Sequence, residues 1–132
     1  MVQKRISGGS WFTGPPRAMS CLSWNCHGLG HPRTVQVLLE LVRSNKSDFI
    51  FLMETLCSRE KLENLKFKLG FNNLFHVDKV GRSGGLAFYW KSSHNVRLLK
   101  FGRNFIDVRV ENADSRTWRC TRFYGFPETS KR

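Results

Sequence analysis

Two short apolar segments, each followed by a helical pattern, constrain this fold more than any other feature. Residues 21–26 and 48–54 are apolar runs bounded by turn residues, as expected for buried strands. After the first run, apolar residues recur at the spacing of an amphipathic helix that ends near Asn45. After the second run, Ser58 predicts a helix N-cap and Gly70 predicts the helix end. The first half of the chain therefore predicts the order β-α-β-α.

Beyond residue 70 the hydrophobic period changes to two, which is typical of strands with one buried face. Short sequences rich in Gly, Asn and Ser separate these segments and predict turns. The predicted strands cover residues 72–78, 86–91, 96–101, 105–111 and 118–124. The whole pattern predicts an α/β fold in which β-α-β-α is followed by antiparallel strands.

Each of the first two strands ends on a polar side chain, Asn25 on the first and Glu54 on the second. Right-handed crossover connections lay such strands parallel, so their carboxyl ends meet at the same sheet edge. A carboxylate at this edge requires solvent, an ion pair or a bound cation. A Mg²⁺ ion on Glu54 satisfies this requirement, with Asn25 holding a phosphate oxygen or a metal-bound water. An ordinary ion pair between Glu54 and an arginine is the alternative.

The charge of the chain indicates a polyanionic partner. Its 132 residues include 22 Lys and Arg against 10 Asp and Glu, a net charge of +12. Basic surfaces attract polyanions by long-range steering and counterion release, which makes DNA or another nucleic acid the leading partner class. A basic protein with solvated lysines remains the alternative.

The ends of the chain differ from its centre. Residues 1–18 are rich in Gly, Ser and Pro and are expected to form a disordered leader, with a tail at 129–132. No apolar run approaches the roughly 20 residues of a membrane-spanning helix, and no secretory signal is recognisable. We therefore expect no membrane association, no obligate protein partner and an intracellular location, nuclear or cytoplasmic.

The cysteines lack a C-x-x-C pair and the regular spacing of a disulfide framework, which favours a reducing compartment. Four metal-binding side chain types do lie close together in the sequence, at Cys21, Cys26, His27 and His31. Their spacing matches no common zinc-ligand pattern, so we do not expect structural zinc.

Four ordered motifs resemble the endonuclease/exonuclease/phosphatase superfamily. They are SWNCHGLG at residues 23–30, DFIFLMET at 48–55, GGLAFYW at 84–90 and FYGFP at 123–127. The resemblance covers residues 19–128, and the apurinic-type endonuclease domain of plant non-LTR retrotransposons is the nearest likeness. It implies two facing β-sheets flanked by helices and Mg²⁺-dependent phosphodiester hydrolysis, with Mn²⁺ as a substitute.

The resemblance also implies roles for individual residues. Asn25 is similar to the family's phosphate- and metal-organising asparagine, Glu54 to its metal-binding carboxylate, and Tyr124 to the tyrosine beside the scissile phosphate. His27 lies in a loop where the likeness implies contact with nucleic acid. The turn at Arg82 and Ser83 offers a guanidinium and backbone amides to a DNA phosphate, or is simply a hairpin turn that needs glycine.

Two motifs of the family are missing. The catalytic base belongs to a Gly-Asp-Phe-Asn-like motif and its partner pair to a Ser-Asp-His-like motif, and the sequence contains neither. We therefore expect the N-terminal half of a two-sheet α/β sandwich, a truncated domain with little or no activity alone and a weakly held metal. Half a sandwich is also expected to leave apolar side chains uncovered, among them Phe88, Trp90, Trp118 and Phe123.

Two other functions stay open. The first alternative is a non-catalytic basic module that binds nucleic acid by charge alone. The second is a phosphatase or deadenylase of the same superfamily. Salt-dependent DNA binding that is indifferent to loss of Glu54 distinguishes the first of these from a metal-dependent nuclease.

Overall fold

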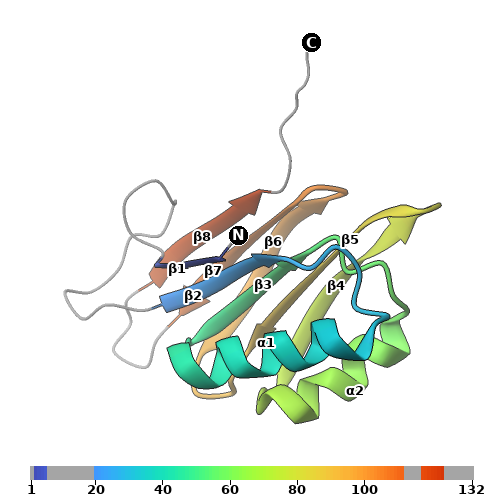
Figure 1. Ribbon diagram of the computed structural model, residues 1–132. Coiled ribbons are helices and arrows are strands. Elements are labelled where there is room, and N and C mark those ends of the chain that lie inside the picture. The colour runs from blue at the N-terminus through green and yellow to red at the C-terminus, as the bar shows by residue number, and fades with distance from the viewer. Residues whose placement is uncertain (1, 6–19, 112–116, 124–132) are drawn as a thin grey trace.

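The computed structural model describes residues 2–5, 20–111 and 117–123. Its elements in chain order are β1 (Val2–Arg5), β2 (Ser20–Asn25), α1 (Pro32–Asn45), β3 (Phe49–Met53), α2 (Arg59–Leu69), β4 (Asn73–Val80), β5 (Ser83–Trp90), β6 (Asn95–Gly102), β7 (Phe105–Glu111) and β8 (Thr117–Phe123). The strands form a larger sheet of order β1-β2-β3-β5-β4 and a smaller one of order β6-β7-β8 (Figure 1). The predicted α/β fold with two sheets is confirmed.

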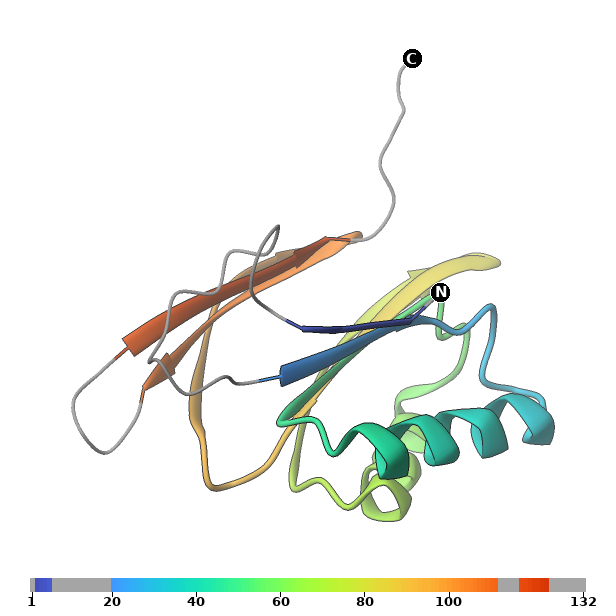
Figure 2. The ribbon, with the colours of Figure 1, turned by 60° about the vertical axis from the view of Figure 1, so that its left-hand side comes forward.

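The helices and the smaller sheet cover opposite faces of the larger sheet (Figure 2). Both faces need cover because strand β3 is apolar on both sides, and its side chains alternate between two hydrophobic cores. Phe49 and Phe51 face the smaller sheet and pack in one cluster with Ile106 and Val108. The other face belongs to the helices, whose cluster with β3 and β5 includes Ile50, Leu52, Ala87, Tyr89, Leu38, Leu62 and Leu65.

Local signals set the ends of both helices. His31 precedes α1, and its Nδ1 accepts a hydrogen bond from the Arg33 N–H at 3.0 Å. Ser58 caps α2 by accepting from the Lys61 N–H at 3.2 Å, and Gly70 ends that helix with a φ of 81°. The predicted capping roles of Ser58 and Gly70 are therefore confirmed, and each satisfies backbone groups that a helix end leaves unpaired.

The N-terminal segment Val2–Arg5, which lies within the predicted leader, is a strand. This segment forms β1 and pairs antiparallel with β2, in a register that sets Val2 opposite Trp24. The physical reason is that β2 otherwise has an open edge of unpaired backbone groups, which an extended segment can satisfy. Residues 1 and 6–19 and the predicted tail at 129–132 lie outside the described part of the chain.

The prediction of uncovered apolar side chains is correct for Phe123 and wrong for Phe88. Phe88 is 1% exposed, because the smaller sheet covers it, and Trp90 is half-buried against the same core. Phe123 is 57% exposed and stacks on Phe105, with ring centroids 5.7 Å apart. The side chain of Trp118 lies outside the description. The sheets therefore bury their shared face within this chain.

Candidate functional site

The candidate site lies where β2 and β3 end. The two strands are parallel, with Asn25 opposite Met53, so Glu54 follows at the next position along the same edge. The predicted juxtaposition of Asn25 and Glu54 is therefore confirmed. Parallel pairing produces it, because both chains leave the sheet in the same direction.

Backbone hydrogen bonds continue beyond the strands and hold the loop at Glu54 from both sides. On the β2 side, the Gly28 N–H donates to the Glu54 carbonyl at 2.8 Å. On the β5 side, the Thr55 N–H donates to the Gly85 carbonyl at 3.1 Å and the Leu56 N–H to the Gly84 carbonyl at 3.4 Å. Glu54 thus lies on a short segment clamped between its neighbours, which fixes its backbone direction.

Three non-glycine residues around this segment have a left-handed backbone. His27 has a φ of 53°, Glu54 of 52° and Leu56 of 50°. Each costs on the order of 1–2 kcal/mol relative to a right-handed conformation. Such strain is retained where the surrounding structure enforces it, and it is concentrated at functional sites. The clamp described above supplies the enforcement here.

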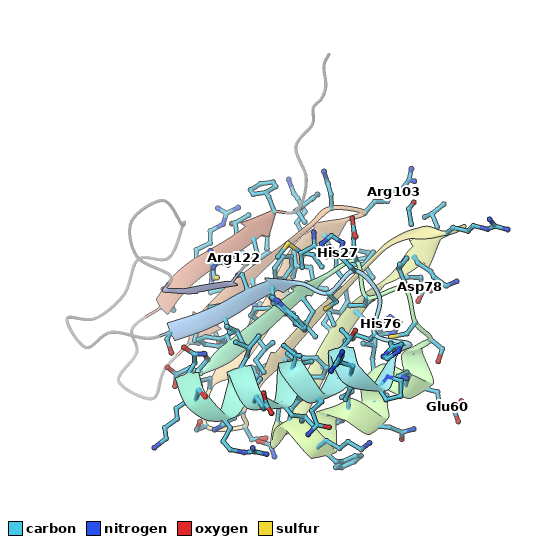
Figure 3. All side chains as sticks on the ribbon, viewed as in Figure 1. His27, Glu60, His76, Asp78, Arg103 and Arg122 are labelled. Atoms are coloured by element: carbon cyan, nitrogen blue, oxygen red, sulfur yellow. The ribbon has the colours of Figure 1, made fainter. Side chains whose placement is uncertain are left out.

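His27 contacts the two predicted site residues. Its Nδ1 lies 3.2 Å from Glu54 Oε1, and its backbone N–H donates to Asn25 Oδ1 at 3.2 Å. The His27 side chain is 75% exposed and that of Glu54 is 27% exposed, so the carboxylate is open to solvent on part of its surface. Figure 3 shows His27 where the chain leaves β2. We refer to Asn25, His27 and Glu54 together as the Asn25-His27-Glu54 cluster, the candidate site.

The cluster fits part of a magnesium site. Mg²⁺ retains several waters and is usually bound by one or two carboxylates together with substrate phosphates. Glu54 supplies one carboxylate and Asn25 an amide oxygen at the same edge. No group of three or more His, Cys, Asp or Glu side chains suited to a metal occurs in the described ranges. The residues present therefore fit a weakly held Mg²⁺ or Mn²⁺ ion that depends on further ligands.

Two cysteines near the candidate site are shielded from solvent, Cys26 almost fully and Cys57 in part. Burial raises the pKa of the Cys26 thiol, with smaller contributions from Cys57 and Glu54. Burial likewise raises the pKa of Cys57. The expected absence of structural zinc stays a prediction. His31 is occupied as the cap of α1.

Arg82 and Ser83 lie at the tip of the β4–β5 hairpin. The Ser83 hydroxyl donates to the Val80 carbonyl at 3.3 Å, which closes the turn, and Arg82 is exposed. The hairpin interpretation of this turn is therefore supported for Ser83. Their predicted contact with nucleic acid stays a prediction. Tyr124, the third predicted catalytic residue, lies outside the described residues.

Gly85 and Thr55, which position Glu54, were not predicted from the sequence. Gly85 has a φ of 94°, and a Cβ there would lie 2.5 Å from Thr55 Oγ1. Only glycine allows the start of β5 to approach the Glu54 segment this closely. The signal in the sequence is the Gly-Gly pair at residues 84–85, which opens an apolar strand.

A model of the endonuclease/exonuclease/phosphatase family matches residues 22–127. The chain belongs to this family. The matched region begins in β2 and ends beyond β8. Asn25, His27 and Glu54 of this endonuclease/exonuclease/phosphatase family member all lie within it. No curated protein matches the sequence. Membership in this superfamily supports a phosphodiesterase or nuclease type of chemistry.

No helix among the described residues has both the length and the apolar character needed to cross a membrane.

Proposed function

We propose that this chain carries part of a Mg²⁺-dependent phosphodiesterase centre of the DNA-endonuclease type, similar to the domain found in plant non-LTR retrotransposons. The observation that carries the proposal is the convergence of Asn25 and Glu54 at one sheet edge, on a clamped and strained segment. Such an edge of an α/β sheet is where ligands commonly bind. Family membership and the order of the four motifs support the same chemistry.

In this proposal each residue of the cluster has a separate task. Glu54 holds the cation through its partly exposed carboxylate, and Asn25 orients a phosphate oxygen or a metal-bound water. A bound Mg²⁺ ion would supply Lewis-acid polarisation of the phosphoryl group. His27, whose Nδ1 lies 3.2 Å from Glu54 Oε1, orients the carboxylate. Tyr124 is proposed beside the phosphate on the family resemblance alone.

The proposed activity of these 132 residues by themselves is little or none. Neither the Gly-Asp-Phe-Asn nor the Ser-Asp-His motif that would supply the catalytic base and its partner occurs in them. A positioned base contributes roughly 10²–10⁴ in rate, and loss of one member of a catalytic set removes most of the activity of that set. Cation binding and catalysis are therefore expected to separate in this chain.

The substrate class follows from charge. A net charge of +12 favours DNA or another nucleic acid over a small neutral ester. The same charge supports a second function, a basic module that binds nucleic acid without chemistry. The two differ in what Glu54 does, because charge-driven binding does not need a carboxylate.

A combined cleavage and binding assay tests the proposal. Purified chain is incubated with supercoiled plasmid and Mg²⁺, and binding to a DNA duplex is measured with and without chelator for the wild type and Glu54→Gln. We expect no nicking, and DNA binding that Mg²⁺ strengthens in the wild type only. Strong Mg²⁺-dependent nicking contradicts the proposed inactivity. Binding that is indifferent to chelator and to Glu54→Gln supports the basic module instead.

A further inference from the structure

A cavity lies at the opposite end of the larger sheet from Glu54. It has a volume of about 340 Å³ and is bounded by the end of α1, the segment that leads into β3, the end of α2 and the residue after β5. Lys46 and Ser47 precede β3 and Glu54 follows it, so a five-residue strand separates the two sites. At about 3.3 Å per residue this strand alone spans roughly 17 Å.

Four basic residues line this cavity, Arg43, Lys46, Lys68 and Lys91, and no acidic residue lines it. None of the four forms a salt bridge with another described residue. Lys91 Nζ is held 5.3 Å from the ring centroid of the buried Phe71, a cation–π contact that keeps it at the cavity. Unpaired like charges that converge on one hollow raise its affinity for anions.

Helix dipoles explain only half of this cluster. Basic side chains are favoured in the last turn of a helix, where Arg43 lies in α1 and Lys68 in α2. Lys46 lies beyond the last turn of α1, and Lys91 follows a strand. Three separate segments of chain, the end of α1, the end of α2 and the residue after β5, therefore bring positive charge to the same place.

The wall of the cavity also contains an unpaired buried hydroxyl. Ser47 lines it and is 2% exposed, and its Oγ has no hydrogen-bond partner in the described part of the chain. A buried hydroxyl without a partner costs on the order of 1–3 kcal/mol. An oxyanion in the cavity would give this donor an acceptor after a rotation about the Cα–Cβ bond. Charge and hydrogen bonding thus favour the same kind of ligand.

We propose that this cavity is a binding site for a phosphate group, supplied either by a small phosphate ester or by the backbone of a nucleic acid. Its volume is at the lower end of the range of small-molecule sites, which suits a phosphate and an attached sugar. The proposal goes beyond the proposed function, because no residue of the Asn25-His27-Glu54 cluster lines the cavity. The two sites can therefore be tested independently.

The test is an amide-resolved NMR titration of the whole chain with inorganic phosphate, a mononucleotide and a single-stranded oligonucleotide. We expect saturable shifts at the amides of Lys46 and Ser47. Shifts with phosphate or mononucleotide identify a small-molecule site, and shifts with the oligonucleotide alone identify a backbone site. Absence of saturable shifts at these amides with all three ligands overturns the proposal.

Two double variants distinguish a specific binding site from nonspecific attraction by the net positive charge of the chain. Lys46→Gly with Lys91→Gln is expected to weaken binding about tenfold or more, since two charge-assisted contacts are lost. Lys46 has a φ of 48°, so glycine fits its backbone and this change does not unfold the chain. Lys100→Gln with Arg109→Gln removes the same charge on the smaller sheet. Equal weakening by both pairs overturns the proposal.

Discussion

Gly85 and Thr55 approach each other so closely that no side chain fits between them. A Cβ on Gly85 would lie 2.5 Å from Thr55 Oγ1 and 3.2 Å from the Leu56 nitrogen. The Gly85 carbonyl also accepts the hydrogen bond from the Thr55 N–H. The start of β5 therefore fixes the segment that carries Glu54, although Gly85 and Glu54 are 31 positions apart in the sequence.

Gly85→Ala is expected to destabilise the chain by about 2 to 4 kcal/mol, from overpacking against Thr55 combined with the cost of a left-handed alanine. Urea denaturation measures this loss. Gly84→Ala is the matched control, because Gly84 has a similar φ of 87° but nothing within 4 Å of its Cβ position. It is expected to cost about 1 kcal/mol. Equal losses in the two variants would show that the close approach to Thr55 is unimportant.

Acid is expected to weaken the smaller sheet through Asp107. This carboxylate is 3% exposed, and it accepts hydrogen bonds from Arg119 Nε at 3.1 Å, Arg119 Nη2 at 2.6 Å and Thr121 Oγ1 at 2.8 Å. The hydrogen bond from Arg119 lowers the pKa of Asp107, against the opposing effect of burial. The resulting stabilisation is complete above the unfolded value of about 3.9 and is lost as the pH falls through the folded value.

Urea denaturation of Arg119→Gln between pH 2 and pH 7 tests this account. The variant is expected to be less stable than the wild type at pH 7, and the difference is expected to shrink as the pH falls below about 4. Arg109→Gln is the control, because Arg109 is exposed and lies directly opposite Arg119 in the sheet register. A difference that stays constant down to pH 2 would rule out Asp107 as the cause.

Arg122 is a buried guanidinium that joins the two sheets. Figure 3 labels it on β8. It is 8% exposed, its Nη2 donates to Ser23 Oγ at 2.9 Å, and its Nε has no hydrogen-bond partner among the described residues. Replacing an incompletely satisfied buried charge with an apolar side chain is often neutral or stabilising. Arg122→Met is therefore expected to preserve stability or raise it by about 1 kcal/mol.

Ser23→Ala provides the contrast for Arg122. It removes the hydroxyl that accepts from the guanidinium and is expected to cost about 1 to 3 kcal/mol, since the charge stays buried. Thermal denaturation of both variants measures the difference. Arg122→Met that destabilises more than Ser23→Ala would mean that the guanidinium contributes net stability.

Most helices and strands could be predicted from the hydrophobic periodicity and from capping and turn residues. The predicted strand at 105–111 coincides with β7, and the caps of α2 are where Ser58 and Gly70 predict them. The juxtaposition of Asn25 and Glu54 was also predictable, because it depends only on two parallel strands with short connections to their helices. These features are encoded within short windows of sequence.

Features that depend on distant segments were not predictable. β1 forms because β2 offers it an edge, and the strand pattern of residues 2–5 alone is too short to indicate this. Asp107 alternates with apolar residues in β7, a pattern that by itself predicts a solvated side chain, yet Arg119 and Thr121 cover it. The contact between His27 and Glu54 lies where both residues have a left-handed backbone, a conformation that is uncommon for residues other than glycine and that the local sequence does not indicate.

The most direct test of the account is a Mg²⁺ titration of the wild type and Glu54→Gln, followed through the backbone amides of residues 25–29 and 53–56. We predict weak, saturable shifts confined to these segments in the wild type and their loss in Glu54→Gln, because an amide replaces the carboxylate that holds the cation. Asp78→Asn, which removes an exposed carboxylate on β4, serves as the control and should leave the shifts unchanged. Identical Mg²⁺-dependent shifts in the wild type and Glu54→Gln would contradict the account.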